Sequence, residues 1–296
     1  MTHVPGPVDE GFRCSQASAR AGEPMAGTAP TGTAWLFVEY AGPWARKAVA
    51  ESRQPEDVRT LLDGLDDVRV QLIRRHGGVS GPGVRVFAAE LGEATRVWTT
   101  VLRDVRELLD LDVAALAAGA DPGLTPHDDL LWLVCTNGRR DLCCAELGRP
   151  IASALAARWP EATWETTHLG GHRFAGTLLA LPSGVALGRL DVESAVAACT
   201  DLAAGLLPVD RARGRVGLAP AAQVAELHVR RELGLRDLGA VVVTSVDGEH
   251  VALTTPRGPV VVRVEVSPGV PGHQSCADPT TTAAPRYTIR ARQPPQ

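Results

Sequence analysis

Hydrophobic and polar positions follow the same order of expected elements twice along this chain. In the first stretch, the apolar run AWLFVEY (34–40) predicts a buried strand, and PEDVRTLLDGLDD (55–67) has helical spacing. Strand-like alternation follows in VRVQLI, GVRVFAAEL and TRVWTTVL, and DVRELLDLDVAALAAG then has helical spacing. The order is strand, helix, two or three strands, helix.

The second stretch repeats this order after a joining segment, DPGLTPHDD. We expect an apolar strand at 129–136, an amphipathic helix at 145–159 and a second strand at 162–169. A hairpin at 176–190 and a closing helix at 191–207 follow. The first of these strands ends at Cys135, and Asp191 is the expected N-cap of the closing helix. The repetition predicts two copies of one α/β arrangement.

The remaining segments have weaker patterns. Residues 1–32 are rich in Gly, Pro, Ala and Thr and predict an irregular lead-in. After the two α/β units, at 33–120 and 128–210, residues 218–268 predict a helix followed by three strands, which is a small C-terminal α+β module. Residues 269–296 predict a flexible tail because Pro, Thr and Ala dominate them. The expected fold class is α/β.

Composition and charge narrow the function classes. The 296 residues are 45% hydrophobic and carry a formal net charge of −4, which gives no electrostatic reason to bind nucleic acid or an anionic membrane. The start of the chain lacks the features of a signal peptide, and no apolar run is long enough to cross a bilayer. We therefore expect a cytoplasmic protein, in which clustered cysteines indicate metal or redox chemistry rather than disulfides.

The segments CTNGRRDLCC and THLGGH hold the candidate chemistry. Cys135 ends a predicted strand, while Cys143 and Cys144 open the following helix, whose N-terminus favours the thiolate form. His168 ends the next strand, and the two glycines after Leu169 would let the chain turn and aim His172 back. Strand ends and helix starts meet at one edge of such a sheet, so these side chains are expected to converge.

The ligand spacing is wider than that of a zinc finger. Eight residues separate Cys135 from Cys144, and the histidines lie more than twenty residues further on. A 2Fe-2S cluster with two Cys and two His ligands is the natural candidate, and a zinc ion is the alternative. The other cysteines, Cys14, Cys199 and Cys276, are expected to have no such partners, and Cys199 fits the apolar stripe of its helix.

These residues resemble the sucrase/ferredoxin-like family over about residues 10 to 210. The resemblance is carried by CTNGRRDLCCAELGRPIASAL, WETTHLGGHRFAGTLLALPSGVALGRL and GTAWLFVEYAGPWARKAV. It implies tandem thioredoxin-like (ferredoxin-type) units, of which 33–120 is degenerate and without ligands and 128–210 is the 2Fe-2S ferredoxin domain. Thioredoxin-like ferredoxins use four cysteines, with C-L-G-x-C at the last two, where this chain has His168-Leu-Gly-Gly-His172.

The resemblance also implies a ligand set, because the family shares the Cys…Cys and H-x-x-x-H pattern. The implied ligands are Cys135, Cys144, His168 and His172. The R-D-x-x-C spacing resembles the family pattern at Cys144, with Cys143 as the alternative. The carboxylates are scattered, so nothing supports a sucrase activity.

The expected function is electron transfer. Two thiolates and two neutral imidazoles carry less negative charge than four thiolates, so the reduction potential should be raised, as in Rieske centres, and should depend on pH. Flanking arginines at 139, 140 and 173 form either a solvated rim or a surface that steers an acidic redox partner protein, a reductase or electron acceptor.

Two other functions stay open at this point: an interaction module with a structural zinc site, and a thioredoxin-like thiol oxidoreductase. The second would need a C-x-x-C pair, which is absent. No G-x-S-x-G elbow, phosphate-binding loop or dinucleotide fingerprint occurs, so an electron carrier is favoured over a substrate-transforming enzyme.

Overall fold

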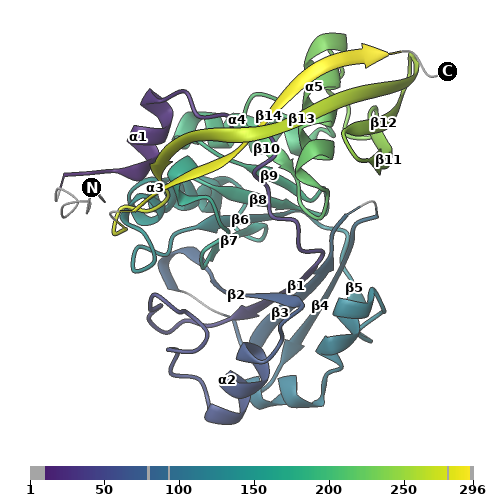
Figure 1. Cartoon of the computed structure of the whole chain (residues 1–296). Helices are drawn as coiled ribbons and strands as arrows, with labels where there is room; N and C mark the ends of the chain where they lie inside the picture. Colours follow the sequence, from purple (N-terminus) through teal and green to yellow (C-terminus); the bar gives the residue numbers. More distant parts are fainter. Residues whose placement is uncertain (1–10, 79–80, 93, 279, 294–296) are drawn as a thin grey trace.

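The computed structural model describes residues 11–78, 81–92, 94–278 and 280–293. The expected lead-in residues 1–10 and tail residues 279 and 294–296 therefore lie outside the described residues. The fold class is α/β, as the sequence predicts, with one large sheet, a second smaller sheet and several helices (Figure 1). Among the described residues, no helix combines the length and apolar character needed to cross a lipid bilayer.

The large sheet has ten strands in the order β10-β9-β8-β6-β7-β2-β1-β3-β4-β5. The strands are β1 (Ala34–Glu39), β2 (Val68–Arg74), β3 (Val84–Glu90), β4 (Arg96–Leu102), β5 (Thr125–Pro126), β6 (Leu131–Cys135), β7 (Thr163–Thr166), β8 (Leu178–Leu181), β9 (Val185–Leu187) and β10 (Ala212–Arg215).

Both halves of this sheet have the same arrangement. The parallel strands β1 and β2 are connected through α2 (Glu56–Asp63), and the parallel strands β6 and β7 through α3 (Leu142–Arg158). On the other side of β1 and of β6 lies an antiparallel hairpin, β3–β4 or β8–β9. The halves meet where β2 and β7 pair in antiparallel fashion. The repeated order is the tandem α/β arrangement that the hydrophobic pattern predicts.

The two halves share a buried core. β1 and β6 are buried at every position, which explains their continuous apolar runs: both faces of these strands are covered. One core cluster combines Trp35 and Phe87 of the first half with Trp164 of the second, and it also includes Cys135 and Cys144. The Phe87 and Trp164 rings meet edge to face with centroids 5.7 Å apart. Cys135 and Cys144 are therefore part of the buried core that the two halves share.

Several helices differ from the sequence prediction. The predicted helix at 104–119 is two 3-10 helices, η2 (Val105–Asp110) and η3 (Val113–Ala118), because Leu111 is extended and the Asp112 side chain caps a new start. A short helix, α1 (Cys14–Arg20), lies in the predicted irregular lead-in. Asp191 caps α4 (Val192–Ala203) through a capping box, as predicted.

The C-terminal region contains α5 (Pro220–Leu233) and a four-stranded sheet in the order β11-β12-β13-β14. The strands are β11 (Val242–Asp247), β12 (His250–Thr255), β13 (Gly258–His273) and β14 (Thr281–Gln293). The part of residues 269–296 that the structure describes is thus mainly a β-ribbon and not the flexible tail that its composition predicts. Backbone pairing forms this ribbon despite its prolines, because the register shifts between Pro268 and Pro271.

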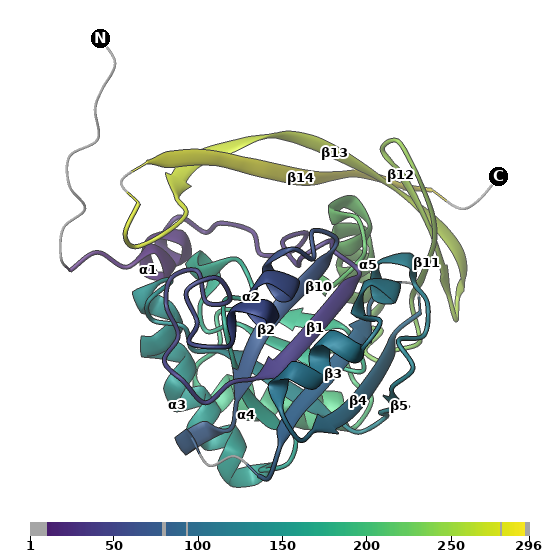
Figure 2. The same cartoon turned by 90° about the horizontal axis from the view of Figure 1, so that it is seen from below.

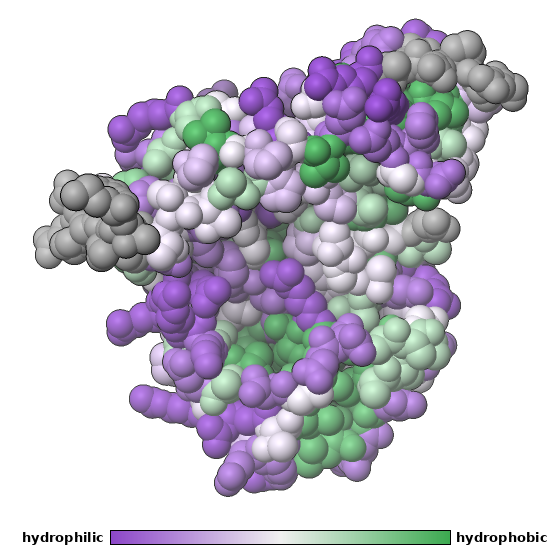
Figure 3. Space-filling model, in the orientation of Figure 1, coloured by the Kyte–Doolittle hydropathy of each residue, from purple (hydrophilic) through white to green (hydrophobic). Residues whose placement is uncertain are grey.

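The β13–β14 ribbon arches across the molecule, and its turn reaches the side where α1 lies (Figure 2). On the face shown in Figure 3, hydrophobic residues are seen mainly over the lower part, where the first half of the large sheet lies. The part that contains the ribbon is more hydrophilic, and many residues in the second half of β13 are exposed.

Candidate metal centre

Two buried thiols lie at the junction of β6 and α3. β6 ends at Cys135, and α3 begins after Asp141, whose carboxylate caps the helix by accepting a hydrogen bond from the backbone N–H of Cys143 (3.0 Å). Cys144 lies in the first turn of α3, and its thiol and that of Cys135 are both about 1% exposed or less. The strand end and the helix start thus bring two sulfur donors together, as predicted.

The two histidines flank a tight turn after β7. Gly170 and Gly171 have φ angles of 91° and 72°, in the left-handed region that side chains other than glycine rarely adopt. This confirms that the histidines are spaced by a turn and not by a helix. His172 begins η4 (His172–Phe174), and its Nδ1 lies 3.1 Å from Nε2 of His168.

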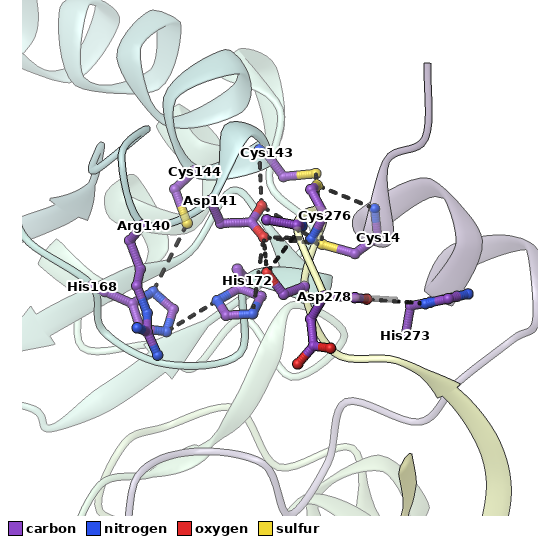
Figure 4. A network of polar contacts seen from close by, with 12 residues as sticks. Cys14, Arg140, Asp141, Cys143, Cys144, His168, His172, His273, Cys276 and Asp278 are labelled. Carbon is purple, nitrogen blue, oxygen red and sulfur yellow. Dashed lines mark hydrogen bonds and ion pairs between the residues drawn. The ribbon is translucent and has the colours of Figure 1, made fainter. Parts of the chain in front are cut away.

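The first buried donor group consists of Cys135, Cys144 and His168, whose ligand atoms all lie within 4.8 Å of one another. The Sγ of Cys144 is 3.9 Å from Nδ1 of His168, and His172 lies on the far side of the His168 ring (Figure 4). This group can hold a metal ion. The structure therefore brings three of the four implied ligands into one group and places the fourth, His172, directly beside it.

Cys143, the alternative to Cys144, points into a second group. Its Sγ lies 3.8 Å from that of Cys14 and 3.2 Å from that of Cys276, and Asp141 completes the set. The expectation that Cys14 and Cys276 have no company is therefore wrong. Sequence separations of 129 and 133 residues hide these contacts from any local pattern. Cys199, in α4, is buried in the core, as expected.

Two arginines that no sequence pattern indicates, the half-buried Arg69 and the buried Arg213, hold the histidine turn. Arg69 of β2 donates to the carbonyl oxygen of His168 (3.3 Å), and Arg213 of β10 donates to that of Gly170 (2.9 Å). Burial lowers the pKa of Arg69 to about 10 and that of Arg213 to about 9, so both stay charged at neutral pH. Nothing in the sequence separates these two arginines from the others.

The pKa shifts of His172 and Cys135 favour the forms that bind metals, whereas the hydrogen bond with Cys135 raises the pKa of the Cys144 thiol. Burial, with a smaller contribution from the charge of His168, lowers the pKa of His172 to about 4, so its imidazole is neutral at pH 7 and keeps a free lone pair. Hydrogen bonds from Cys144 and then His168 lower the pKa of the Cys135 thiol despite its burial. Thiolate and neutral imidazole are the forms that bind metals.

The flanking arginines divide into two kinds. Arg173 forms an ion pair with Glu23 (2.7 Å) and stacks over Phe174, so its charge is largely matched within the protein. Arg139 is exposed, and Arg140 lies beside His168 (Figure 4). Among the described residues, no ion pair involves Arg139 or Arg140, which leaves positive charge at the rim near the histidines.

Comparison with known proteins gives one match. The sequence model of the family described as sucrase/ferredoxin-like matches residues 25–204, which is more than half of the 296-residue chain. Curated proteins and solved structures give no match. The matched region contains all of the first donor group and the whole of β1 to β9.

Proposed function

The chain belongs to the sucrase/ferredoxin-like family, and on that premise we propose that it is an electron-transfer protein that holds a 2Fe-2S cluster. The proposed ligands are Cys135, Cys144, His168 and His172. The observation that carries the proposal is the convergence of two buried thiols with His168 at the junction of β6, α3 and the turn after β7, with the His172 ring in contact with that of His168.

The donor set fits such a cluster in its chemistry. The two thiols come from one junction and the two imidazoles from one turn, so the donors form a sulfur pair and a nitrogen pair, which is the division of ligands in a Rieske-type centre. When bound, such a cluster takes up and releases one electron. The protein's own residues exclude water from the thiol side, because both thiols are buried.

The surrounding charges favour gain of an electron. Arg69 and Arg213 place two positive charges, one half-buried and one buried, at the backbone of the histidine turn, and each interacts electrostatically with Cys135. Neutral imidazoles add to this effect because they replace thiolates. We therefore expect a raised reduction potential, which also depends on pH because each imidazole has a second nitrogen that can bind a proton.

The half-buried His168 and the rim beside it offer the shortest path for an electron to a partner. Arg139 and Arg140 supply positive charge there, which suits a redox partner protein with an acidic docking surface. By contrast, a thiol oxidoreductase must expose its reactive sulfur to a substrate, and both Cys135 and Cys144 are buried. This exposure argument favours electron transfer over thiol exchange.

Iron and acid-labile sulfide analysis of the anaerobically purified chain tests the proposal. We expect about two iron and two sulfide per chain, visible charge-transfer bands, and an EPR signal after reduction. A colourless protein whose first donor group holds zinc would overturn the proposal and leave the structural-zinc alternative.

A further inference from the structure

We propose that the second donor group is a separate metal site, which binds a single zinc ion and fastens both α1 and the turn of the β13–β14 ribbon to the start of α3. Its ligands are the thiolates of Cys14, Cys143 and Cys276 and the carboxylate of Asp141. All four residues are buried, and Figure 4 shows their donor atoms turned toward one another. This inference uses different ligands from the cluster and does not depend on it.

The sulfur distances match one tetrahedral ion. The Sγ atoms of Cys14, Cys143 and Cys276 lie 3.8, 3.2 and 3.5 Å apart. Zinc–sulfur bonds of about 2.3 Å in a tetrahedron place the sulfur atoms about 3.8 Å apart, so a small expansion of the group admits the ion. A cluster spreads its ligands over several irons and needs wider spacing than this.

The fourth donor is already oriented. Both carboxylate oxygens of Asp141 lie 3.7 Å from the Sγ of Cys14, a distance near the edge of the same tetrahedron. One oxygen accepts from the backbone N–H of Cys143 (3.0 Å), and the other from that of Cys276 (2.8 Å) and from the Ser275 hydroxyl (3.0 Å). Asp141 is thus held by two of the segments that the ion would join.

Hydrogen bonds to the sulfur atoms support the thiolate form. The Ser15 hydroxyl donates to the Sγ of Cys143 (3.2 Å), and the backbone N–H of Cys14 donates to that of Cys276 (3.4 Å). Such bonds around a metal ligand spread its negative charge and fix its direction. Four acidic groups packed in one buried place can all ionise together only when a cation lies between them.

The ribbon needs a fastening of this kind. From Glu265 to Gln274, no residue of β13 or the turn is buried, and the same holds from Thr281 to Arg290 in β14. Among the described residues of the turn, Ser275 and Cys276 are buried again. Apolar packing therefore cannot hold this end of the ribbon, and the apolar cluster around the thiols is small.

The same argument applies to α1. This helix has seven residues, lacks a side-chain N-cap, and buries only Cys14, Ser15 and Ser18. Helices of this length are unstable without tertiary support, and two serines and a cysteine supply little apolar area. A metal bond to Cys14 gives this support.

A disulfide explains the group less well. It would join two of the three sulfur atoms and leave the third, together with the oriented Asp141 carboxylate, without a role. Among single ions, zinc best matches three thiolates and one carboxylate in tetrahedral geometry, because it is closed-shell and binds both donor types.

Metal analysis and zinc X-ray absorption of the unmodified full chain test the proposal. We expect about one zinc per chain with three sulfur and one oxygen in its first shell, whatever the iron content. Absence of zinc, two sulfur and two nitrogen neighbours, or a disulfide among the three cysteines by mass would each overturn it. The two-nitrogen result would place zinc at the histidines and so contradict the proposed function, whereas the other two results leave that function intact.

Variants add a test of the fastening role. Cys276→Ser should abolish zinc binding and leave iron unchanged, while Cys199→Ser, at a buried cysteine outside both groups, should keep both metals. Removal of zinc from the unmodified chain should speed trypsin cleavage at Arg286 in the ribbon several-fold, with cleavage at exposed Arg103 unchanged. Retention of zinc by Cys276→Ser, or equal cleavage rates with and without zinc, would overturn the proposal.

Discussion

At the scale of single residues, the adjacent cysteines of α3 point into different donor groups. Successive residues of a helix differ by about 100° in direction, so the side chains of Cys143 and Cys144 diverge from neighbouring positions. Cys144 meets Cys135 and His168, while Cys143 meets Cys14 and Cys276. Asp141 lies between the groups, 3.9 Å from Nε2 of His172. One turn of helix therefore contributes to two donor groups of different composition.

This divergence gives a matched pair of variants. Cys144→Ser should lose most of the bound iron and keep the zinc, because it removes a sulfur donor of the first group only. Cys143→Ser should do the reverse. Metal analysis of both purified proteins, with circular dichroism as the control for folding, decides the matter. Equal loss of iron in the two variants would show that Cys144 has no special role as a ligand.

The histidine ligands should control the reduction potential. His172→Cys places a thiolate where a neutral imidazole lies, and the added negative charge should lower the potential by an amount on the order of 100 mV and weaken its pH dependence. Redox titrations at several pH values measure both effects. His250→Cys, at an exposed position in β12, is the control and should leave the potential as it is. An unchanged potential in His172→Cys would argue against His172 as a ligand.

The sequence predicts the first donor group well, for a local reason. Cys135 and Cys144 lie within one strand-helix-strand unit, and His168 and His172 follow its last strand directly, so the topology brings strand ends and the helix start together. The arginines that hold the turn could not be predicted, because Arg69 and Arg213 come from β2 and β10, far away in the chain.

At the scale of elements, the position of Cys135 depends on close packing of α3 against the end of β6. A Cβ atom at Gly148 would lie 2.0 Å from the carbonyl oxygen of Cys135, so the helix can approach this strand only with glycine there.

Gly148→Ala should therefore push α3 away from β6 and disturb the cysteine geometry. We expect a loss of about 1–3 kcal/mol in the free energy of unfolding and a lower iron content. Gly239→Ala, where a Cβ meets no atom within 4 Å, is the control. Chemical denaturation and iron analysis give the two readouts, and a fully stable Gly148→Ala protein with normal iron would contradict the packing argument.

Element prediction succeeds where burial shapes the pattern. α5 matches the predicted helix because its apolar residues recur with helical spacing. The hairpin β8–β9 matches its predicted position because both strands are continuous apolar runs on either side of a Pro-Ser-Gly turn. From Thr281 to Arg290, no residue of β14 is buried, so no apolar alternation marks this strand. Its composition predicts a tail instead. Helix α1 is missed for a similar reason, since its buried face is a cysteine and two serines.

At the scale of the whole molecule, the two halves of the sheet are joined by a buried ionic network. Glu165 of β7 is bound by Arg74 of β2 (2.8 Å), by the Thr136 hydroxyl (2.8 Å) and by His76 of η1 (His76–Gly78; 2.9 Å). Its side chain is only 6% exposed. This carboxylate spans the β2–β7 junction, so it links the half that contains β1 and β2 to the half with the donors.

Glu165→Gln should weaken this junction. It leaves the Arg74 guanidinium without its charged partner, at a cost of about 3 kcal/mol in the free energy of unfolding. Burial by itself would raise the pKa of Glu165, but hydrogen bonds from Arg74, Thr136 and His76 outweigh it and lower the pKa. The Glu165 carboxylate therefore binds a proton more readily in the unfolded chain than in the folded protein. The stability that Glu165 contributes is present above its ordinary pKa of 4.5 and is lost as the pH falls below that value.

Urea unfolding at pH 7 and pH 3.5 measures both effects. The unmodified protein should lose more stability over this interval than Glu165→Gln, while Glu193→Gln, at an exposed position of α4, should behave like the unmodified protein. An equal loss in all three proteins would show that Glu165 does not stabilise the junction.

Pulsed EPR of the reduced, anaerobically purified protein tests the central claim most directly, because it detects the iron–sulfur centre and the nuclei bound to it in one experiment. Ligation by His168 and His172 predicts an iron–sulfur signal with strong coupling to two imidazole nitrogens. An iron–sulfur signal without nitrogen coupling, or no such signal from a fully folded protein, would contradict the account.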